Sequence, residues 1–447
     1  MQRQWMLSRM YLYIKTIGMK RRRIVLSVTN DLVTDQRVHR SATALQEAGY
    51  DVTLVGRLLP DSPPVERSYR TVRMRLLFRR KAVFYAEYNI RLLLRLLFMR
   101  ADAFYANDTD TLLANWVASR LRAKPIFFDA HEMFPEVPEL VGRPRVKRFW
   151  TRIEDRILPK LSRRGAAAVT VCQSIADIYA ERYGLRMGVV RNVPWKRRTE
   201  KTENGERRTE NDRRDRMGAT DVIERRMEID RRDRMGATDV IERRTENDRR
   251  ERFVLLYQGA VNIGRGIEWV MDAMPLLPEC QFAIAGTGDV YDELKTRKER
   301  KGLDNVVFLG RLEPEALHAV TATASLGISL LENRGLNYYY SLPNRIADFV
   351  QAGVPVLATD FPEIRRVVEG YGIGTLVPPQ PFDAAENCSE PPSPELLAQT
   401  IRETLAYWES MPAEERAARF RRAADELSFE KDKKVLLSAV ETIFEQK

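Results

Sequence analysis

A glycine-containing turn in the second half of the chain carries residue types suited to phosphate binding. The segment QGAVNIGRG at 258–266 follows an apolar run and places Gly259, Gly264 and Arg265 just before a helical pattern. Glycine lets the backbone approach a ligand closely, and a helix start offers free N–H groups to an anion. Arginine can add a bidentate contact to a phosphate. The turn is not the phosphate loop of ATPases, because the Gly-Lys-Ser/Thr ending is absent.

A second turn, AGTGD at 285–289, also follows an apolar run. Gly286 and Gly288 would leave room for a nucleotide at this point. A plain tight turn explains the same residues equally well.

A third segment, YYYSLPNR at 338–345, precedes a helical pattern that ends at Gly353. Ser341 is a plausible cap, and proline suits a first helical turn. Free N–H groups at Asn344, together with Arg345, would form an anion site aimed at a diphosphate. Ordinary helix capping is the alternative.

Titratable residues follow an apolar run in the first half of the chain. The segment FDAHE at 128–132 holds His131 and Glu132, and the whole sequence has only three histidines. A titratable pair at a strand end suits a binding site better than a core. The acidic triplet Asp108-Thr109-Asp110 resembles a metal-binding motif, but it opens a helix, so capping explains it better. No metal is assigned.

The elements that must position these residues alternate between strand and helix in both halves. Continuous apolar strands separated by helices predict parallel sheets covered on both faces, and hence two doubly wound α/β domains. In the first half, strands are expected at 23–30, 51–56, 103–106, 125–129, 167–172 and 188–191, with helices at 34–48, 110–121, 146–161 and 174–183. In the second half, strands are expected at 254–258, 281–285, 306–309, 326–330, 354–359 and 375–377, with helices at 265–274, 290–301, 313–324, 344–352, 362–369, 394–409 and 413–445. Ligands bind beyond the carboxyl ends of such strands, so a central cleft between the domains is the expected active site.

The length of 447 residues also favours two domains. We expect a leader of uncertain status at 1–18, an N-terminal Rossmann-like domain at 19–195, a charged insertion or linker at 196–252, and a C-terminal Rossmann-like domain at 253–412. The segment 413–447 is expected to form a helix that packs back toward the N-terminal domain. Within the linker, an 18-residue unit at 206–223 recurs at 224–241. Its polarity favours disorder or a loose charged helix over a functional module.

Charge is distributed unevenly between the two halves. Residues 1–195 hold 35 Lys+Arg and 18 Asp+Glu, a net of +17, which leaves −6 of the total +11 for the rest. This asymmetry favours an anionic partner for the first half, such as a membrane surface, nucleic acid or a phosphorylated acceptor, against a merely solvated basic face. The segment 67–100 is both basic and apolar. It fits an anionic membrane surface or a buried helix with snorkelling arginines.

Compartment is indicated by two further features. No stretch reaches the roughly 18 uncharged apolar residues of a membrane-spanning helix. The three cysteines are widely spaced and form neither a metal motif nor a disulfide framework, which favours a reducing cytoplasm.

Taken together, these motifs resemble bacterial glycosyltransferases of family 4, especially a group common in Bacteroidetes. The phrases that carry the resemblance occur in order along nearly the whole chain: TNDLVTDQRVHR, FYAEYNIRLLLRLLF, NDTDTLLAN, FDAHEMFPEVPEL, LYQGAVNIGRG, YYSLPNRIADFVQAGVPVLATDFPE and GTLVPP. The resemblance implies the GT-B fold and sugar transfer with retention of configuration. It implies neither a metal nor another cofactor, because the nucleotide-sugar is a co-substrate.

The resemblance also implies roles for individual donor-side residues. Arg265 stands where the family has a diphosphate-contacting lysine, whereas Ala260 replaces the partner arginine. The family commonly has two glutamates separated by seven residues. The second corresponds to Asp348, which would contact a ribose, but Tyr340 occupies the first position. Asn344 and Arg345 are expected to compensate.

On the acceptor side, His131 corresponds to the family's active-site histidine, which contacts the transferred sugar. The glycine-rich N-terminal loop of many relatives is replaced by residues 30–37, so Asp31, Asp35 and Arg37 are expected to shape the acceptor site together with Glu132.

The resulting hypothesis is a retaining, hexosyltransferase-like enzyme of polysaccharide or cell-envelope biosynthesis. It would move a sugar from a nucleotide-diphosphate donor to a lipid-linked or surface-polysaccharide acceptor, on the inner face of the cytoplasmic membrane. A nucleotide-sugar epimerase of the same fold and a non-catalytic sugar-nucleotide-binding protein are the alternatives. Nucleic-acid binding is not expected, because no recognised module supports it.

Overall fold

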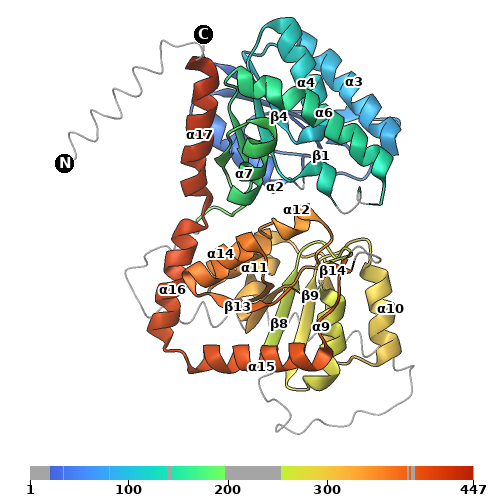
Figure 1. Cartoon of the computed structure of the whole chain (residues 1–447), viewed down its shortest axis with the longest axis vertical. Coiled ribbons are helices and arrows are strands. Elements are labelled where there is room, and N and C mark those ends of the chain that lie inside the picture. The colour runs from blue at the N-terminus through green and yellow to red at the C-terminus, as the bar shows by residue number, and fades with distance from the viewer. Residues whose placement is uncertain are drawn as a thin grey trace, which may run out of the picture. The chain divides into compact units, whose positions relative to one another are not determined.

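The computed structural model describes residues 21–33, 35–79, 81–137, 140, 142–196, 253–379, 382–383 and 388–445. The expected leader and the 18-residue repeat therefore lie outside the described residues. The chain divides into two compact units (Figure 1). Unit 1 comprises Met1–Asn192 and Phe429–Lys447, and unit 2 comprises Val193–Ser428.

Unit 1 is built on a parallel seven-stranded sheet with the order β3-β2-β1-β4-β5-β6-β7. Its strands are β1 (Arg23–Asp31), β2 (Asp51–Leu58), β3 (Arg70–Arg75), β4 (Ala103–Asn107), β5 (Ile126–Ala130), β6 (Ala168–Thr170) and β7 (Gly188–Val189). Its helices are α2 (Gln36–Glu47), α3 (Lys81–Phe98), α4 (Thr109–Arg122), α6 (Pro144–Arg163), α7 (Gln173–Tyr183) and α17 (Phe429–Glu445), with a short 3-10 turn η1 (Phe134–Glu136).

Unit 2 repeats this design with a parallel six-stranded sheet of order β10-β9-β8-β11-β12-β13. Its strands are β8 (Phe253–Gln258), β9 (Cys280–Ala285), β10 (Val306–Gly310), β11 (Leu326–Ser329), β12 (Val356–Thr359) and β13 (Gly374–Val377), with a small antiparallel pair β14 (Phe382–Asp383) and β15 (Cys388–Ser389). Its helices are α9 (Ile267–Ala273), α10 (Tyr291–Lys301), α11 (Pro314–Thr323), α12 (Leu336–Tyr339), α13 (Asn344–Ala352), α14 (Pro362–Tyr371), α15 (Pro394–Ser410) and α16 (Ala413–Glu426), with a 3-10 turn η3 (Met274–Leu276).

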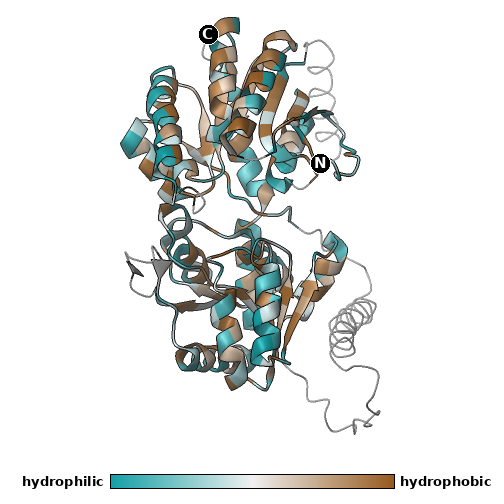
Figure 2. Cartoon of the chain, turned by 90° about the vertical axis from the view of Figure 1, so that its right-hand side faces the viewer, coloured by the Kyte–Doolittle hydropathy of each residue, from teal (hydrophilic) through white to brown (hydrophobic). Residues whose placement is uncertain are grey.

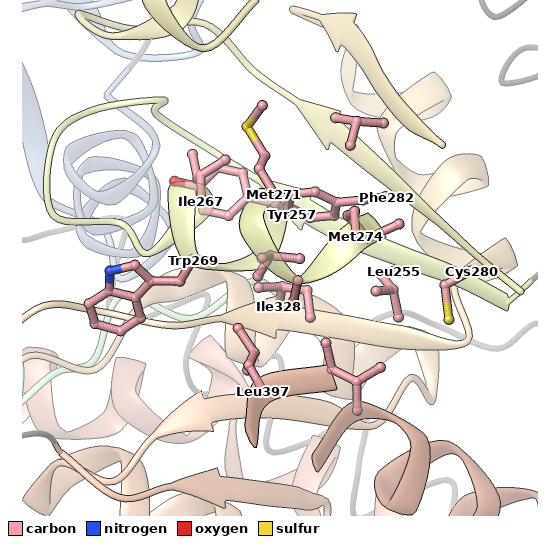
Figure 3. Close-up of a cluster of buried hydrophobic side chains, with 14 of the residues drawn as sticks. Leu255, Tyr257, Ile267, Trp269, Met271, Met274, Cys280, Phe282, Ile328 and Leu397 are labelled. Carbon is pink, nitrogen blue, oxygen red and sulfur yellow. The ribbon is translucent and has the colours of Figure 1, made fainter. Parts of the chain in front are cut away.

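Apolar packing explains why these elements form. Strands β4 and β5 are buried along their whole length. In Figure 2, strands visible in the sheets are coloured mainly toward the hydrophobic end of the scale. In unit 2, apolar side chains of β8, β9, α9 and α15 meet in one buried cluster (Figure 3). Strands covered on both faces read as continuous apolar runs, so the prediction of two doubly wound α/β domains is confirmed.

Both sheets reverse their strand order in the middle. The order in unit 1 changes direction between β1 and β4, and the order in unit 2 changes between β8 and β11. At such a switch point the connecting loops leave on opposite sides and open a crevice at the carboxyl edge of the sheet, where α/β proteins bind ligands. The candidate functional residues are therefore expected at the carboxyl ends of the central strands of each sheet.

Two segments differ from the sequence-based expectation. The basic stretch 67–100 contains strand β3 as well as helix α3. The single helix expected over 413–445 is two helices, of which α16 belongs to unit 2 and α17 to unit 1. Helix α17 packs against α2 and β7, and Asp432 pairs with Arg191 at 2.7 Å. Within the described ranges, no helix combines the length and apolar character needed to cross a bilayer.

Candidate functional site

The two glycine turns of unit 2 pack directly on each other. The turn after β8 is tied to the turn after β9, since Gly259 N donates to Ala285 O at 2.9 Å and Val261 N donates to Thr287 O at 3.1 Å. Gly286 has a φ of +147°, and a Cβ there would overlap the carbonyl oxygen of Gly259. A side chain at 286 is thus excluded by both space and backbone conformation. A Cβ at Gly288 would overlap the carbonyl oxygen of Val261 in the same way. The turns form one rigid backbone surface.

Arg345 lies against this surface and is almost completely buried. Its guanidinium stacks on the ring of Tyr257, with Cζ 4.2 Å from the ring centre, and it faces Gly259. Its Nη1 is buried without a hydrogen-bond partner. Burial lowers the pKa of Arg345, the Tyr257 hydroxyl opposes this shift, and the neighbouring Arg265 adds to it. The fold therefore holds a buried cation with one nitrogen, Nη1, left without a hydrogen-bond partner.

Arg265 supplies a second cation close to Arg345. Its guanidinium lies over the ring of Tyr338, with Cζ 4.7 Å from the ring centre, and its Nε is buried without a hydrogen-bond partner. Tyr338 also lies beside Gly264, where an added Cβ would come within 3.1 Å of the ring. Among the described residues neither arginine forms an ion pair. Two close, unpaired guanidinium groups are unfavourable unless an anion joins them.

The start of α13 also favours a bound anion. Pro343 occupies the cap position, and no side chain accepts a hydrogen bond from the first turn. The Ser341 hydroxyl instead donates to the Tyr338 carbonyl at 2.9 Å, so the predicted Ser341 cap is wrong. The N–H groups at Asn344 and Arg345 therefore have no side-chain cap, and a helix start of this kind favours a negative charge.

Asp348 lies one turn further along α13. Gln258, at the end of β8, donates to its carboxylate at 3.2 Å and accepts a hydrogen bond from Thr321 at 2.8 Å. These contacts place Asp348 on the same edge of the sheet as the glycine turns. The ring of Tyr340 packs edge-on against Tyr339, with ring centres 4.9 Å apart.

In unit 1, His131 lies between two carboxylates at the ends of neighbouring strands. Its Nδ1 is 3.3 Å from the Asp108 carboxylate, which follows β4, and its Nε2 is 3.5 Å from the Asp129 carboxylate of β5. The His131 backbone N–H also donates to Asp108 at 2.7 Å. Only 14% of the His131 side chain is exposed. The ring therefore lies between two carboxylates, and its Nε2 is buried without a hydrogen-bond partner.

Asp129 is the centre of this network. It is fully buried, accepts hydrogen bonds from Arg37 at 2.5 Å and Tyr105 at 2.7 Å, and forms an ion pair with Arg37. Arg37 is itself anchored to the Val190 carbonyl at 2.6 Å. Burial alone would raise the pKa of Asp129, but Arg37 and His131 outweigh it and hold that pKa well below its usual range. Asp129 thus stays ionised.

The charge of His131 follows from its two neighbours. Burial would lower the pKa of the imidazole, but Asp108 and Asp129 together raise it to about 9. Burial raises the pKa of Asp108 to about 7, against the opposing charge of His131. At neutral pH the imidazole is therefore protonated, and it can act as a fixed donor rather than as a base.

Asp108 holds a strained backbone conformation in order to reach His131. Its φ and ψ are 61° and 167°, a region that L-residues rarely adopt and that costs roughly 1–3 kcal/mol. Its side chain makes no capping hydrogen bond to α4, so the capping explanation of the Asp108-Thr109-Asp110 triplet is wrong for Asp108. Asp110 is buried and accepts a hydrogen bond from Thr29 of β1 at 2.5 Å. Within the described residues, no group of three His, Cys, Asp or Glu side chains is arranged to hold a metal ion.

Comparison with protein families assigns each unit. The model for Glycosyltransferase Family 4 matches residues 35–194, all but the last two of which belong to unit 1, and the model for Glycosyl transferases group 1 matches residues 252–403, within unit 2. The two matches span 160 and 152 residues, more than two thirds of the 447. The chain belongs to the group 1 and family 4 glycosyltransferases. These are retaining hexosyltransferases. No curated protein matches the chain in sequence.

Solved structures confirm the GT-B fold of this glycosyltransferase. Sucrose-phosphate synthase from Thermosynechococcus elongatus is 16% identical, with a TM-score of 0.65 over 96% of this chain and 100% of the other. HepE from Anabaena, in complex with UDP-glucose, is 13% identical, with a TM-score of 0.63 over 94% and 99%. WaaG, a glycosyltransferase involved in lipopolysaccharide biosynthesis, is 14% identical, with a TM-score of 0.61 over 94% and 99%.

Within the glycosyltransferase, three residues expected on the acceptor side have structural contacts of their own. Asp31 is buried and pairs with Arg73 at 3.0 Å. Asp35 caps α2 by accepting from Val38 N at 3.0 Å. Arg37 belongs to the Asp129 network. Glu132 is half-buried and contributes a negative charge near Asp110.

Several residues of the glycosyltransferase sites were missed from sequence. In unit 1 these are Asp108, Asp129, Tyr105 and Asp110, and in unit 2 they are Tyr257 and Tyr338. Asp108 and Asp129 could have been found from one signal, since both stand where an apolar run of a central strand ends.

Proposed function

We propose that the glycosyltransferase binds a nucleotide-diphosphate sugar through unit 2 and transfers the sugar to an acceptor with retention of configuration. The observation that carries this proposal is the pair Arg265 and Arg345. Both lie on aromatic rings, both have a buried nitrogen without a partner, and Arg345 stands in the uncapped first turn of α13 with Arg265 close to it. A diphosphate supplies the anionic oxygens that this arrangement lacks.

The same groups would assist departure of the diphosphate. Negative charge grows on the leaving phosphate oxygen as the sugar C1–O bond breaks, and donors fixed in advance stabilise it without reorganisation. The acceptor oxygen forms the new bond to C1 from the face that the diphosphate leaves, and its proton passes to the departing phosphate oxygen. We favour this route over a covalent glycosyl-enzyme, because Asp129 is fully engaged by Arg37, Tyr105 and His131.

His131 is proposed to contact the transferred sugar. Its position between Asp108 and Asp129 supports a fixed, protonated donor that orients a sugar hydroxyl. Asp348 is proposed to bind the ribose hydroxyls, and Gly259, Gly286 and Gly288 to admit the nucleotide. Asp31, Asp35 and Glu132 retain an indirect role on the acceptor side, through the loops that they hold.

The donor can be identified before any acceptor is known. A panel of nucleotide-sugars, beginning with UDP-glucose because the relative HepE was solved with it, should raise the unfolding temperature of the chain when the correct donor is present. Arg265→Ala should abolish most of this stabilisation and of the transfer activity. Arg402→Ala is the matched control, because Arg402 is an exposed arginine of unit 2 paired with Glu279, just before β9. Equal responses of both variants would refute the diphosphate assignment.

The acceptor is proposed to be lipid-linked or a growing surface polysaccharide at an anionic membrane. Helix α3 supports this proposal, because one face is packed in the core and the other exposes large apolar side chains. Val83, Ile90, Leu94 and Phe98 are 50%, 62%, 53% and 85% exposed. Arg91 and Arg95 flank this stripe. An apolar stripe edged by arginines suits the interface of an anionic bilayer.

Sedimentation with lipid vesicles tests the membrane proposal. The chain should bind phosphatidylglycerol vesicles more tightly than phosphatidylcholine vesicles, and added salt should weaken the binding. Leu94→Glu with Phe98→Glu should release the protein, whereas Leu396→Glu, at an exposed leucine of α15 in unit 2, should not. Undiminished binding by the α3 variant would contradict the proposal.

A further inference from the structure

Unit 1 contains a groove at the edge of its sheet opposite to His131. The cavity measures about 760 Å³ and is lined where strands begin, by Arg22 before β1, Asp102 before β4, Pro125 before β5 and Ala166 before β6. The site residues Asp108 and His131, by contrast, follow β4 and β5. The groove therefore lies at the amino ends of the strands, whereas the site lies at the carboxyl ends of strands of the same sheet.

The groove is strongly basic. Four cationic side chains line it, namely Arg22, Arg120, Lys124 and Arg164, against the single carboxylate of Asp102. That carboxylate is already neutralised by Arg23, which donates to it from Nε and Nη2 at 3.0 Å each. Among the described residues, none of the four cations forms an ion pair. The unbalanced positive charge is concentrated in a concave surface, where its field is strongest.

Apolar and aromatic walls stand beside these cations. The half-buried ring of Trp116 lines the groove from α4, with Lys160 Nζ 5.2 Å from its centre. Ile443 and Phe444 line it from the last turn of α17, and Arg22 lies over the Phe444 ring at 4.5 Å. Helix α17 belongs to unit 1 (Figure 1), so these walls are part of the same compact unit. A ligand here would meet cations on one part and an apolar surface on another.

We propose that this groove is a second ligand site, which binds a phosphate or diphosphate joined to an apolar or aromatic group. Cations just before β1 and at the carboxyl ends of α4 and α6 would hold the phosphate, and Trp116 and Phe444 would pack against the rest of the ligand. Arginine suits this role because its fork matches two phosphate oxygens. This site lies in a different unit from the donor site and at the opposite ends of its strands, and it shares no residue with the donor site. The proposal is therefore independent of the proposed sugar transfer.

The chemistry has two possible sources, a lipid headgroup and a free phosphate, which two probes separate. The full-length chain is titrated calorimetrically with monomeric dihexanoyl phosphatidic acid and, separately, with inorganic pyrophosphate. Tighter binding of the phosphatidic acid supports the site with a lipid source. Equal binding of both supports it with a soluble phosphate source. Binding of neither probe at millimolar concentration overturns the proposal.

Variants then place the binding in the groove. Arg120→Glu with Lys124→Glu reverses two charges at the end of α4 and should weaken binding of the better probe at least tenfold. Ala166→Phe fills the groove without changing its charge and should weaken the same binding, which keeps the test decisive if the charge reversal perturbs folding. Arg152→Glu with Arg156→Glu, at exposed positions of α6, carries the matched charge change and should bind within about twofold of wild type. Equal affinity in all the variants would show that the probe binds elsewhere and would overturn the assignment.

Discussion

Replacement of Arg345 by methionine separates a binding role from a structural one. Arg345 is buried on Tyr257, and its Nη1 has no partner. A structural arginine stabilises the protein in the absence of ligand, so its loss would lower the free energy of unfolding. A buried cation whose anionic partner is the ligand instead costs desolvation energy in the ligand-free protein, and methionine would fill the same space without that cost. We therefore expect Arg345→Met to leave the unfolding free energy of the nucleotide-free protein unchanged or to raise it.

The expected loss of nucleotide affinity can be worked out from the same contacts. A charged donor such as Nη1 contributes about 1.5–3 kcal/mol per hydrogen bond. Loss of one such bond corresponds to a roughly 10- to 150-fold larger dissociation constant for the nucleotide. At a nucleotide concentration 100 times the wild-type constant, the wild-type protein gains about 2.7 kcal/mol of stability. A variant that binds 100-fold more weakly gains only about 0.4 kcal/mol at that concentration.

Urea unfolding with and without the best nucleotide of the donor screen measures both quantities on the same samples. Arg416→Met is the matched control, because Arg416 also lies over an aromatic ring of unit 2, 5.8 Å from the centre of Trp408. That variant should keep the full stabilisation by nucleotide. A lower stability of nucleotide-free Arg345→Met, together with an undiminished gain from nucleotide, would instead assign Arg345 a structural role and refute the binding role.

Three further predictions concern the two sites. Gly286→Ala should lower the unfolding free energy by about 1–3 kcal/mol or more in urea titrations, because the new Cβ overlaps Gly259 O at a φ of +147°. Gly370→Ala, with nothing within 4 Å of its Cβ, is the control and should not destabilise the protein. Equal losses of stability in the two variants would contradict the overlap at Gly286. Asp108→Asn should lower the pKa of His131 from about 9, since one of its two carboxylates is lost, and an unchanged pKa in a histidine NMR titration would show that Asp129 alone sets it. The folded-state pKa values of His131, about 9, and Asp108, about 7, lie above their ordinary values of 6.5 and 3.8. Both groups therefore contribute stability that is lost as pH rises through the folded values. Urea unfolding should show a falling stability between pH 6 and pH 9.5, and a rising stability would show that the pKa values are not raised in the folded protein.

The sequence predicted most of the sheet framework, because strands buried on both faces are continuous apolar runs. The segments AFYAN and IFFDA became β4 and β5 for this reason. The stretch 67–100 was harder, because its arginines interrupt the apolar pattern. Strand β3 carries Arg70, Arg73 and Arg75 near the edge of the sheet, and α3 buries only one of its faces. The break near 427–428 was also missed, since a helical pattern continues on both sides of it.

Some site residues could be predicted from local sequence patterns, whereas others depend on contacts between distant segments. Arg265 and Arg345 could be nominated from sequence, because each stands in a local pattern of glycines or beside a helix start. The aromatic support of Arg345 could not, since Tyr257 reaches α13 from strand β8. Asp108 was assigned to the wrong task for the same reason. Its local context fits a helix cap, and only the pairing of β4 with β5 brings it to His131.

The two sites also differ in how they manage buried charge, and this difference separates their functions. In unit 1 the cations Arg37 and His131 are balanced within the fold by Asp129 and Asp108. The charges of this network are matched before any ligand arrives, although His131 Nε2 and Arg37 Nε are buried without a hydrogen-bond partner, and the network offers a positioned imidazole after the end of β5. In unit 2, Arg265 and Arg345 lie close together without a carboxylate partner. That set lacks an anion, which the diphosphate of the proposed donor would supply. Affinity for a diphosphate should therefore depend on unit 2, whereas substitution of His131 should reduce turnover far more than donor binding.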